Sequence, residues 1–260
     1  MDKKELIELH FKGATKLYKS DLIEKENYYI FANSLIDDQY WNMGILKNFR
    51  ADLNLVWNNI KRELQTRNRK PILYLIPDDD FTIAKDFKVL YTDVWLAVEN
   101  LEKFDAYKSQ INVVFKTVTA ELKYNFVNAV MSGFSGENPE DPYEALSDGY
   151  RTALYNSFQN IDNEYKSVHY AGIYNEEIIS TATAIYNEKN AIIYNVTTKK
   201  EYQKLGVCRA MMSYIISDLR EKGVETVCGQ TEQGYYTEMV YKTMGAKEIM
   251  IGRAFVKEEM

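Results

Sequence analysis

Apolar residues change their spacing along the chain, and each change marks a predicted helix or strand. From Val207 to Leu219 they recur every fourth residue, which predicts a helix with one apolar face. Gly223 follows the last turn of that helix, where a glycine favours the left-handed conformation that ends it. The apolar runs 191–198 and 225–230 are short and flank the helix, so they predict strands.

The second half of the chain, from Ile111 onward, alternates strands and helices throughout. A strand at NVVFKTV comes first, and helices over 120–131 and 150–158 follow, joined by a polar loop rich in Gly and Pro. Three strands connected by short hairpin turns then end at Thr198. After the strand 225–230 we expect a short helix within GYYTEMVYKTMGAKEI and a closing strand over 247–256.

The first half shows a similar alternation. We expect a helix over 2–19, strands over 28–35 and 40–46, and a helix over 53–64 capped by Asp52. A strand over 72–76 follows, and then a short helix and a strand within 84–98. The order helix, strand, short helix, strand therefore occurs in both halves, which indicates an internal repeat. We expect an α/β (α+β) fold with a mixed central sheet flanked by helices, in two tandem copies that span 1–105 and 106–260.

Composition and charge narrow the classes of function. An apolar content of 46% predicts a substantial core in a chain of 260 residues, and a net charge of −6 argues against nucleic acid or an anionic membrane as partner. That charge favours a cationic or amine-bearing substrate. The charged amino terminus has no apolar signal region, and no run approaches the ~20 apolar residues of a membrane helix, so we expect a cytoplasmic protein.

Metal chemistry is not expected. The chain has two cysteines, Cys208 and Cys228, and two histidines, His10 and His169, without metal-ligand spacing. His169 lies in a β-rich run and is interpreted as a structural histidine.

The segment with the clearest chemical meaning is the loop QKLGVC between the strand 191–198 and the helix that starts at Val207. A strand that leads through a tight loop into a helix directs unpaired backbone N–H groups and the positive end of the helix dipole to one point. Such a point binds phosphate. In the first half KNFRADLN stands at the corresponding place without the glycine, so we expect that half to shape the structure or the substrate site.

This loop resembles the Arg/Gln-x-x-Gly-x-Gly/Ala signature of the GNAT (GCN5-related) N-acyltransferases. The matching residues are Gln203, Lys204, Leu205, Gly206, Val207 and Cys208. Val240, Tyr241 and Gly245 resemble the closing pattern of the family. Cys208 stands where the family has Gly or Ala, Gly234 where it usually has Asn, and Ala246 where it usually has Phe.

The resemblance implies the fold, the cofactor and a set of binding residues. Acetyl-CoA would be the acyl donor, its pyrophosphate cradled by the signature loop together with Arg209. Val196, Thr197 and Thr198 would pair with the pantetheine arm like an added strand. Lys199, Lys200 and Lys204 surround the expected cradle and either meet phosphate or are solvated surface charges.

The resemblance also implies direct attack of an amine on the thioester. The carbonyl oxygen needs a donor, for which we expect a backbone N–H near Asn195 or Val196. Tyr241 is the candidate that protonates the leaving thiolate, and ring packing alone explains it equally well. No general base is evident on the strand 225–230, where many members of the family carry a glutamate; Glu232, a water chain or an already neutral amine would serve.

The function expected from the sequence is an N-acetyltransferase that moves an acetyl group from acetyl-CoA to a primary amine of a small molecule or peptide. The alternative is a catalytically silent module that binds acyl-CoA, which the missing carboxylate base and Gly234 favour. The sequence does not define the acceptor or the oligomeric state.

Overall fold

The strands form one continuous mixed sheet. The computed structural model describes residues 3–76, 83–134, 144–159 and 164–258. Within them an eleven-stranded sheet has the order β1-β2-β3-β4-β11-β5-β10-β9-β8-β7-β6. The strands are β1 (Asp21–Glu24), β2 (Tyr28–Ala32), β3 (Met43–Leu46), β4 (Leu73–Leu75), β5 (Phe87–Glu99), β6 (Val114–Thr117), β7 (Lys166–Tyr174), β8 (Glu177–Tyr186), β9 (Asn190–Thr198), β10 (Thr226–Glu232) and β11 (Lys247–Lys257).

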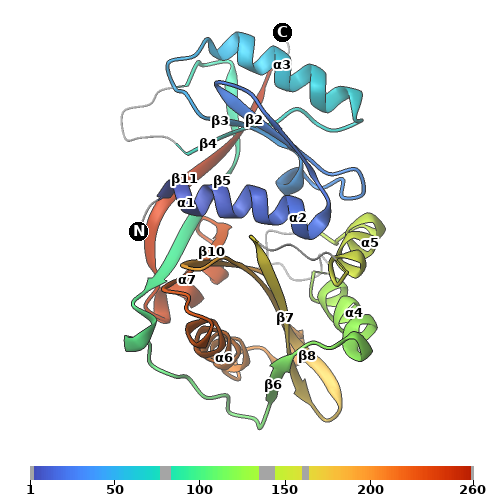
Figure 1. The fold of residues 1–260 in the computed structure, drawn as a ribbon, viewed down its shortest axis with the longest axis vertical. Coiled ribbons are helices and arrows are strands. Elements are labelled where there is room, and N and C mark those ends of the chain that lie inside the picture. The colour runs from blue at the N-terminus through green and yellow to red at the C-terminus, as the bar shows by residue number, and fades with distance from the viewer. Residues whose placement is uncertain (1–2, 77–82, 135–143, 160–163, 259–260) are drawn as a thin grey trace.

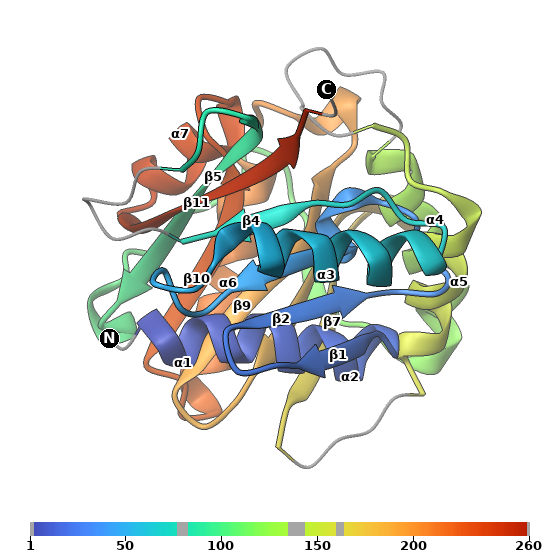
Figure 2. The same cartoon turned by 90° about the horizontal axis from the view of Figure 1, so that it is seen from above.

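Helices cover both faces of this sheet (Figures 1 and 2). They are α1 (Lys3–Glu8), α2 (Ala14–Tyr18), α3 (Leu53–Thr66), α4 (Lys123–Gly133), α5 (Asp148–Ser157), α6 (Val207–Glu221) and α7 (Tyr236–Thr243). Short turns of 3-10 helix are η2 (Gln39–Trp41), η3 (Leu101–Lys103), η4 (Ala120–Leu122) and η5 (Lys200–Tyr202). No described helix has the length and apolar character that crossing a membrane requires.

Each face of the sheet has its own core. Met211, Ile215 and Leu219 of α6 pack on Ala184 and Ile193 of the second-half strands. On the opposite face, a larger cluster joins α1, α2, α4 and α5 to strands of both halves. The apolar face of α3 packs on β2, β3 and β4 in a third cluster. Burial of these faces is the main stabilising contribution, at roughly 25 cal/mol per Å² of apolar surface.

The two halves exchange their last long strands. β5, from the first half, lies between β10 and β11 and is antiparallel to both. β11, from the second half, pairs with β4 of the first. Figure 1 shows β5 and β11 running from the part that carries α3 to the part that carries α6 and α7. The halves therefore share one sheet, and the expected boundary at residue 105 falls in the connection between β5 and β6 and stays a prediction.

Most predicted elements occur close to their expected places. Asp52 caps α3, because its Oδ1 accepts hydrogen bonds from the backbone N–H of Asn54 and Leu55 at 2.9 and 3.2 Å. Gly223 follows α6 with φ of +89°. The mixed α/β character with a GNAT-like sheet was predicted, whereas the continuity of the sheet across both halves was not.

Three differences have local causes. The helix expected over 2–19 contains a π-helical turn, η1 (Leu9–Gly13), which separates α1 from α2. The edge strand β1 is short and half exposed, so it lacks an apolar run. Residues 83–86 form no helix before β5, and the preceding residues 77–82 lie outside the described structure. The polar loop expected after α4 lies partly outside it as well.

Candidate functional site

The parallel strands β9 and β10 separate in the middle of the sheet. Their register runs from the pair Asn190 and Thr226 to the pair Ile193 and Gly229, and ends there. In the pairing of β9 with β8 the register shifts between Thr181 and Thr183, which places an irregularity at Asn195 and Val196. Beyond this point β9 no longer pairs with β10, and a cavity of about 500 Å³ lies between and beside the two strands.

The N-terminus of α6 lies at one end of this cavity. Gly206 has φ of +77° and Lys204 φ of +62°, so the loop makes a sharp left-handed turn before the helix. The first backbone bond of the helix runs from Ala210 N–H to the Gly206 carbonyl at 3.0 Å, and no side chain caps the end. Within the described residues the N–H groups of Val207, Cys208 and Arg209 bind no protein acceptor. Three amides with the helix dipole behind them form an anion site.

The loop is supported from behind by the segment before β6. Gln110 N–H donates to the Leu205 carbonyl at 2.9 Å, and a Cβ at residue 206 would lie 3.2 Å from the Lys108 carbonyl oxygen. Gln203 Nε2 donates to the Thr198 carbonyl at 3.0 Å, which ties the loop to the end of β9. The glycine is therefore required by its φ and by close packing on the protein itself.

Nearly all predicted binding residues surround the same cavity. The lining residues include Asn195, Val196, Thr197, Thr198, Gln203, Lys204, Gly206, Val207, Cys208, Arg209 and Tyr241. Leu205 does not line it. Arg209 donates to Thr243 Oγ1 at 2.9 Å, and Lys199 is paired with Glu177 and lies outside the lining.

Asn195 is the centre of a buried hydrogen-bond network. Its φ is +54°, and its side chain accepts from Tyr150 Oη at 2.6 Å and donates to Tyr18 Oη and Thr183 Oγ1, both at 3.0 Å. All donor and acceptor atoms of the amide group thus have protein partners. The Asn195 side chain fixes the irregularity in β9, and only the backbone of this segment is left to contact a ligand.

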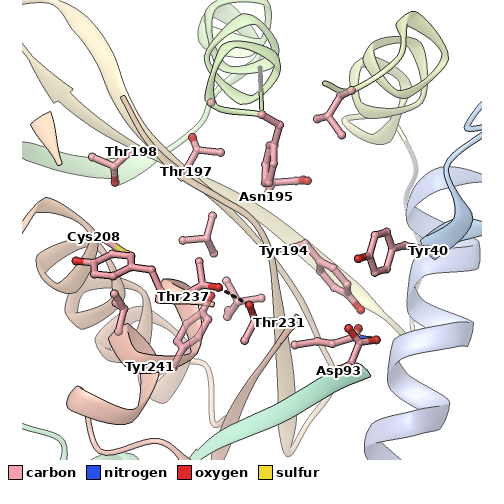
Figure 3. A pocket seen from close by; sticks show the side chains of 18 of the residues that line it. Tyr40, Asp93, Tyr194, Asn195, Thr197, Thr198, Cys208, Thr231, Thr237 and Tyr241 are labelled. Atoms are coloured by element: carbon pink, nitrogen blue, oxygen red, sulfur yellow. Dashed lines mark hydrogen bonds between the residues drawn. The ribbon is translucent and has the colours of Figure 1, made fainter. Parts of the chain in front are cut away.

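Tyr241 projects from α7 against β10. A Cβ at Gly229 would lie 3.2 Å from Tyr241 Cζ, so the ring packs against the glycine backbone where β9 and β10 separate. Tyr241 also lines the cavity, and Figure 3 shows its side chain on the same side as Cys208. Tyr241 therefore both packs its ring on β10 and borders the cavity.

Cys208 is a poor nucleophile in this position. It lines the cavity, yet burial raises the pKa of its thiol to about 11. The thiol therefore stays protonated at neutral pH.

The other end of the cavity is built by the first half of the chain. Lining residues from that half are His10, Phe11, Asp38, Tyr40, Trp41, Met43, Tyr74 and Asp93. In Figure 3 the side chains of Tyr40, Tyr194 and Asp93 lie together, across the pocket from Thr198 and Cys208. The first half, which the sequence predicts to shape either the structure or the substrate site, thus contributes part of the cavity lining.

Asp93 is the acidic group that sequence reasoning missed. It lies on β5, and its Oδ2 accepts from Gln230 Nε2 at 2.5 Å and from Tyr74 Oη at 3.1 Å. Desolvation by burial raises the pKa of Asp93 to about 7, and the nearby charge of Glu232 acts in the same direction. A carboxyl group with such a pKa exchanges a proton near neutral pH. The sequence did contain a signal for this residue, namely a single aspartate in the middle of a largely apolar strand.

Glu232, the last residue of β10, is the register partner of Asp93 on β5. Its Oε2 accepts from Tyr40 Oη at 3.0 Å, and burial raises the pKa of its carboxyl group. Glu232 is not among the lining residues, so Asp93 is better placed as a base.

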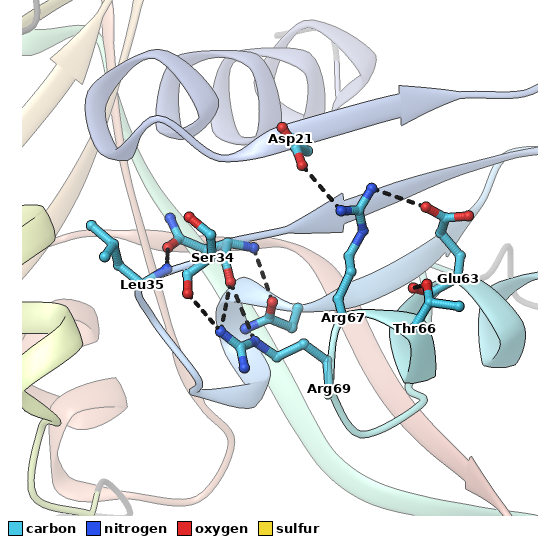
Figure 4. Close-up of polar contacts among 9 residues, drawn as sticks. Asp21, Ser34, Leu35, Glu63, Thr66, Arg67 and Arg69 are labelled. Atoms are coloured by element: carbon cyan, nitrogen blue, oxygen red, sulfur yellow. Dashed lines mark hydrogen bonds and ion pairs between the residues drawn. The ribbon is translucent and has the colours of Figure 1, made fainter.

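Two asparagines hold the loop that brings Asp38, Tyr40 and Trp41 to the cavity. Asn33 Oδ1 accepts from the N–H groups of residues 35 and 36, both at 2.8 Å, and Asn42 Nδ2 donates to the carbonyls of residues 36 and 38, both at 2.8 Å. Arg69 adds hydrogen bonds to the carbonyls of Asn33 and Ser34 at 3.0 Å (Figure 4).

Both histidines are buried and neutral. His10, in the π-helical turn η1, is hydrogen-bonded to Tyr194 Oη at 2.7 Å, and desolvation lowers its pKa to about 3. His169 contacts Thr183 and Ser157, does not line the cavity, and has its pKa lowered to about 3 by burial and by Lys123. In the described residues no group of three His, Cys, Asp or Glu side chains could hold a metal ion.

Part of the chain is similar to a known protein family. Residues 131–245 match the model of the acetyltransferase (GNAT) family. No curated protein matches the chain.

Solved structures similar to the chain share its fold at low sequence identity. A GCN5-related N-acetyltransferase from Kribbella flavida aligns with a TM-score of 0.68 at 10% identity, over 100% of this chain and 97% of its own. A conserved protein of unknown function from Staphylococcus epidermidis gives 0.66 at 13% identity, over 94% and 96%. A tandem GNAT protein from the clavulanic acid biosynthesis pathway gives 0.54 at 8%, over 82% and 74%.

The sheet and the parted strands thus define a mixed α/β protein. More specifically, the chain has the GNAT acetyltransferase fold, and the segment that matches the GNAT family model, residues 131–245, lies in its C-terminal half.

Proposed function

We propose that this protein is an N-acetyltransferase that moves an acetyl group from acetyl-CoA to a primary amine. The observation that carries the proposal is the separation of β9 and β10 after Ile193 and Gly229, directly in front of the uncapped N-terminus of α6. The opening offers backbone groups for an extended arm, and the helix end offers amides for a diphosphate.

The residues present fit acetyl-CoA as a substrate. The N–H groups of Val207, Cys208 and Arg209 would bind the pyrophosphate, with Lys204 adding positive charge at the same end. Val196, Thr197 and Thr198 lie on the part of β9 that has lost its β10 partner, so their backbone would pair with the pantetheine arm. A backbone N–H near Asn195 or Val196 would donate to the thioester carbonyl oxygen.

Transfer requires the amine to be neutral when it attacks. An alkyl ammonium has a pKa of about 10.4, so a base must remove a proton at neutral pH. Asp93 lines the same cavity and titrates near pH 7, and Gln230 and Tyr74 position its carboxyl group. Tyr241, beside the opening of the strands, would give a proton to the leaving thiolate.

The two halves would be copies of one unit that exchanged their last strands. Both halves contain a helix, a strand and a long final strand in the same order, α3-β4-β5 and α6-β10-β11. β4 pairs antiparallel with β11, and β10 pairs antiparallel with β5, so each copy completes the other. This arrangement supports the proposal of a tandem protein with an eroded first half.

Release of free thiol from acetyl-CoA, measured with a panel of amines, tests the function. Thiol release that depends on the amine and forms the N-acetyl product supports the transferase. Acetyl-CoA hydrolysis alone, at the same rate with and without amine, contradicts it.

A silent acyl-CoA-binding module is the second candidate. The full engagement of the Asn195 side chain and the presence of Gly234 favour it. Asp93 speaks against it, because this buried carboxyl group on the neighbouring β5 lines the cavity and could serve as the base. Saturable binding of CoA without thiol release from any amine would favour the silent module.

A further inference from the structure

The end of the cavity formed by the first half holds two carboxyl groups, Asp38 and Asp93. Desolvation by burial raises the pKa of both, and no lysine or arginine of the described residues lowers either. The lysine and arginine among the described lining residues, Lys204 and Arg209, belong to the loop before α6 and to its first turn. Burying a carboxylate without a counter-charge is unfavourable. A cationic ligand would therefore gain affinity here.

Within the part of the chain that the structure describes, each carboxyl group keeps one oxygen without a protein donor. Asp38 Oδ1 accepts from Tyr40 N–H at 2.7 Å, and both hydrogen bonds to Asp93 end on its Oδ2. Among the described residues nothing donates to Asp38 Oδ2 or Asp93 Oδ1. Each of these two oxygens can accept a hydrogen bond from an ammonium group.

The two carboxyl groups come from different parts of the fold. Asp38 precedes η2, between β2 and β3, whereas Asp93 lies on β5, and within the described residues they share no hydrogen-bond donor. Both act on Tyr91, whose pKa burial raises further. The buried Tyr91 hydroxyl has no hydrogen-bond partner within the described structure. In the described part of the chain, each carboxyl group has its own free oxygen and can pair with its own cationic group.

The walls of this end are aromatic. Phe11, Tyr40, Trp41, Tyr74 and Tyr194 line it. Tyr40 packs on Tyr91 with ring centroids 4.5 Å apart and ring planes tilted by 39°. Aromatic faces bind alkyl chains by burial and attract ammonium groups electrostatically.

We propose that the acceptor is an alkane diamine or related oligoamine, with the reacting amino group at Asp93 and a second ammonium paired with Asp38. The proposal rests on the proposed function. The aromatic walls would hold the methylene chain between the two amino groups.

The transfer step balances as follows. The ammonium gives one proton to the Asp93 carboxylate, and the neutral nitrogen attacks the thioester carbonyl carbon to form the C–N bond. The C–S bond then breaks, and the thiolate takes up a proton. The nitrogen loses two protons in all, the first of them to Asp93, and the thiolate takes up one. One proton is therefore released for each N-acetyl product and CoA thiol formed.

Two homologous series separate a dication site from a general amine site. Thiol release is measured with 1,3-diaminopropane to 1,8-diaminooctane and with the monoamines from propylamine to octylamine. We expect kcat/KM of the best diamine to exceed that of the monoamine of equal length by at least tenfold. Equal values at every length would overturn the proposal.

The variant Asp38→Asn tests the assignment of the second ammonium. Its Oδ1 can still accept from Tyr40 N–H, so the η2 turn should persist. We expect at least a tenfold loss with the best diamine and less than twofold with the matching monoamine. The control is Asp37→Asn, which removes the neighbouring exposed carboxylate that does not line the cavity. This control should preserve the preference for the diamine over the monoamine. Equal losses for diamine and monoamine in Asp38→Asn would contradict the pairing.

Binding measurements distinguish failure of this proposal from failure of the transferase. If no amine releases thiol, the same diamines are titrated calorimetrically into the protein saturated with CoA. Binding that Asp38→Asn weakens at least tenfold supports the dication site while the transferase proposal fails. No binding by any diamine overturns the inference.

Discussion

Tyr241 packs its ring against the backbone of Gly229, at the last register pair before β9 and β10 separate. A side chain at position 229 would fill the space that the ring occupies, since a Cβ would lie within 3.5 Å of three ring atoms. The glycine on β10 and the tyrosine on α7 thus form one structural unit at the opening.

Tyr241→Phe keeps this packing and removes only the hydroxyl. If the hydroxyl protonates the leaving thiolate, kcat should fall about tenfold or more, while the KM for acetyl-CoA changes by less than about twofold. Steady-state thiol release measures both. Tyr236→Phe is the matched control, because Tyr236 lies on the same helix and also lines the cavity. An unchanged kcat in Tyr241→Phe would remove the hydroxyl from the mechanism.

Gly206→Glu should abolish binding of CoA without unfolding the protein. Its Cβ would lie 3.2 Å from the Lys108 carbonyl oxygen behind the loop, and its carboxylate would add a negative charge near the amides of α6, where the pyrophosphate is expected. We expect affinity to fall at least a hundredfold by calorimetry. Gly223→Glu is the control at the other end of α6. The backbone φ is +89° at Gly223 and +77° at Gly206. A Cβ added at Gly223 would meet nothing within 4 Å. Both variants carry left-handed strain of roughly 1–2 kcal/mol, and the contact with Lys108 adds a cost at position 206 alone. Urea unfolding of both variants is therefore measured beside CoA binding, and normal CoA affinity in folded Gly206→Glu would contradict the phosphate site.

Asp93→Asn should stabilise the protein at alkaline pH. Because the folded pKa of about 7 exceeds the ordinary value of 3.8, the folded state retains a proton that the unfolded state has lost between these pH values. Unfolding free energy therefore decreases by roughly 1.4 kcal/mol per pH unit across this window. The advantage of the asparagine variant over the original protein should grow by up to about 4 kcal/mol from pH 4 to pH 8.

Urea unfolding of both proteins at several pH values measures this difference. Asp37→Asn, which removes an exposed carboxylate, controls for the change of net charge alone. A constant difference between Asp93→Asn and the original protein from pH 4 to pH 8 would show that the carboxyl group is not held protonated. If Asp93→Asn is more stable and also transfers acetyl groups more slowly, Asp93 is a residue that supports activity at the expense of stability.

The sequence predicted the phosphate-binding end of the site because that end is built from contiguous residues. A strand, a loop with Gly206 and a helix from Val207 follow one another, so their spacing was readable. Asp93 was missed because it becomes part of the site only when β5 inserts between β10 and β11. Pairing of strands from opposite halves depends on long-range contacts, which hydrophobic periodicity does not specify. The same applies to Asp38 and Tyr40, which lie in an irregular segment between β2 and β3.

Asn42→Ala should weaken acceptor binding while leaving CoA binding intact. The Asn42 side chain accepts from Asn33 N–H at 2.9 Å and donates to the carbonyls of Ile36 and Asp38, and it is buried. Its loss would leave these groups unpaired and release the segment that carries Asp38 and Tyr40.

We expect Asn42→Ala to lose about 2–4 kcal/mol of stability and to raise the KM for the acceptor at least fivefold, with the affinity for CoA within twofold of the original. Asn48→Ala, which removes an exposed asparagine side chain hydrogen-bonded to Asn27, is the matched control and should change none of these quantities. Because Asn42 is distant in sequence from the loop before α6, equal losses of CoA and acceptor affinity would show that the two ends of the cavity are not independent.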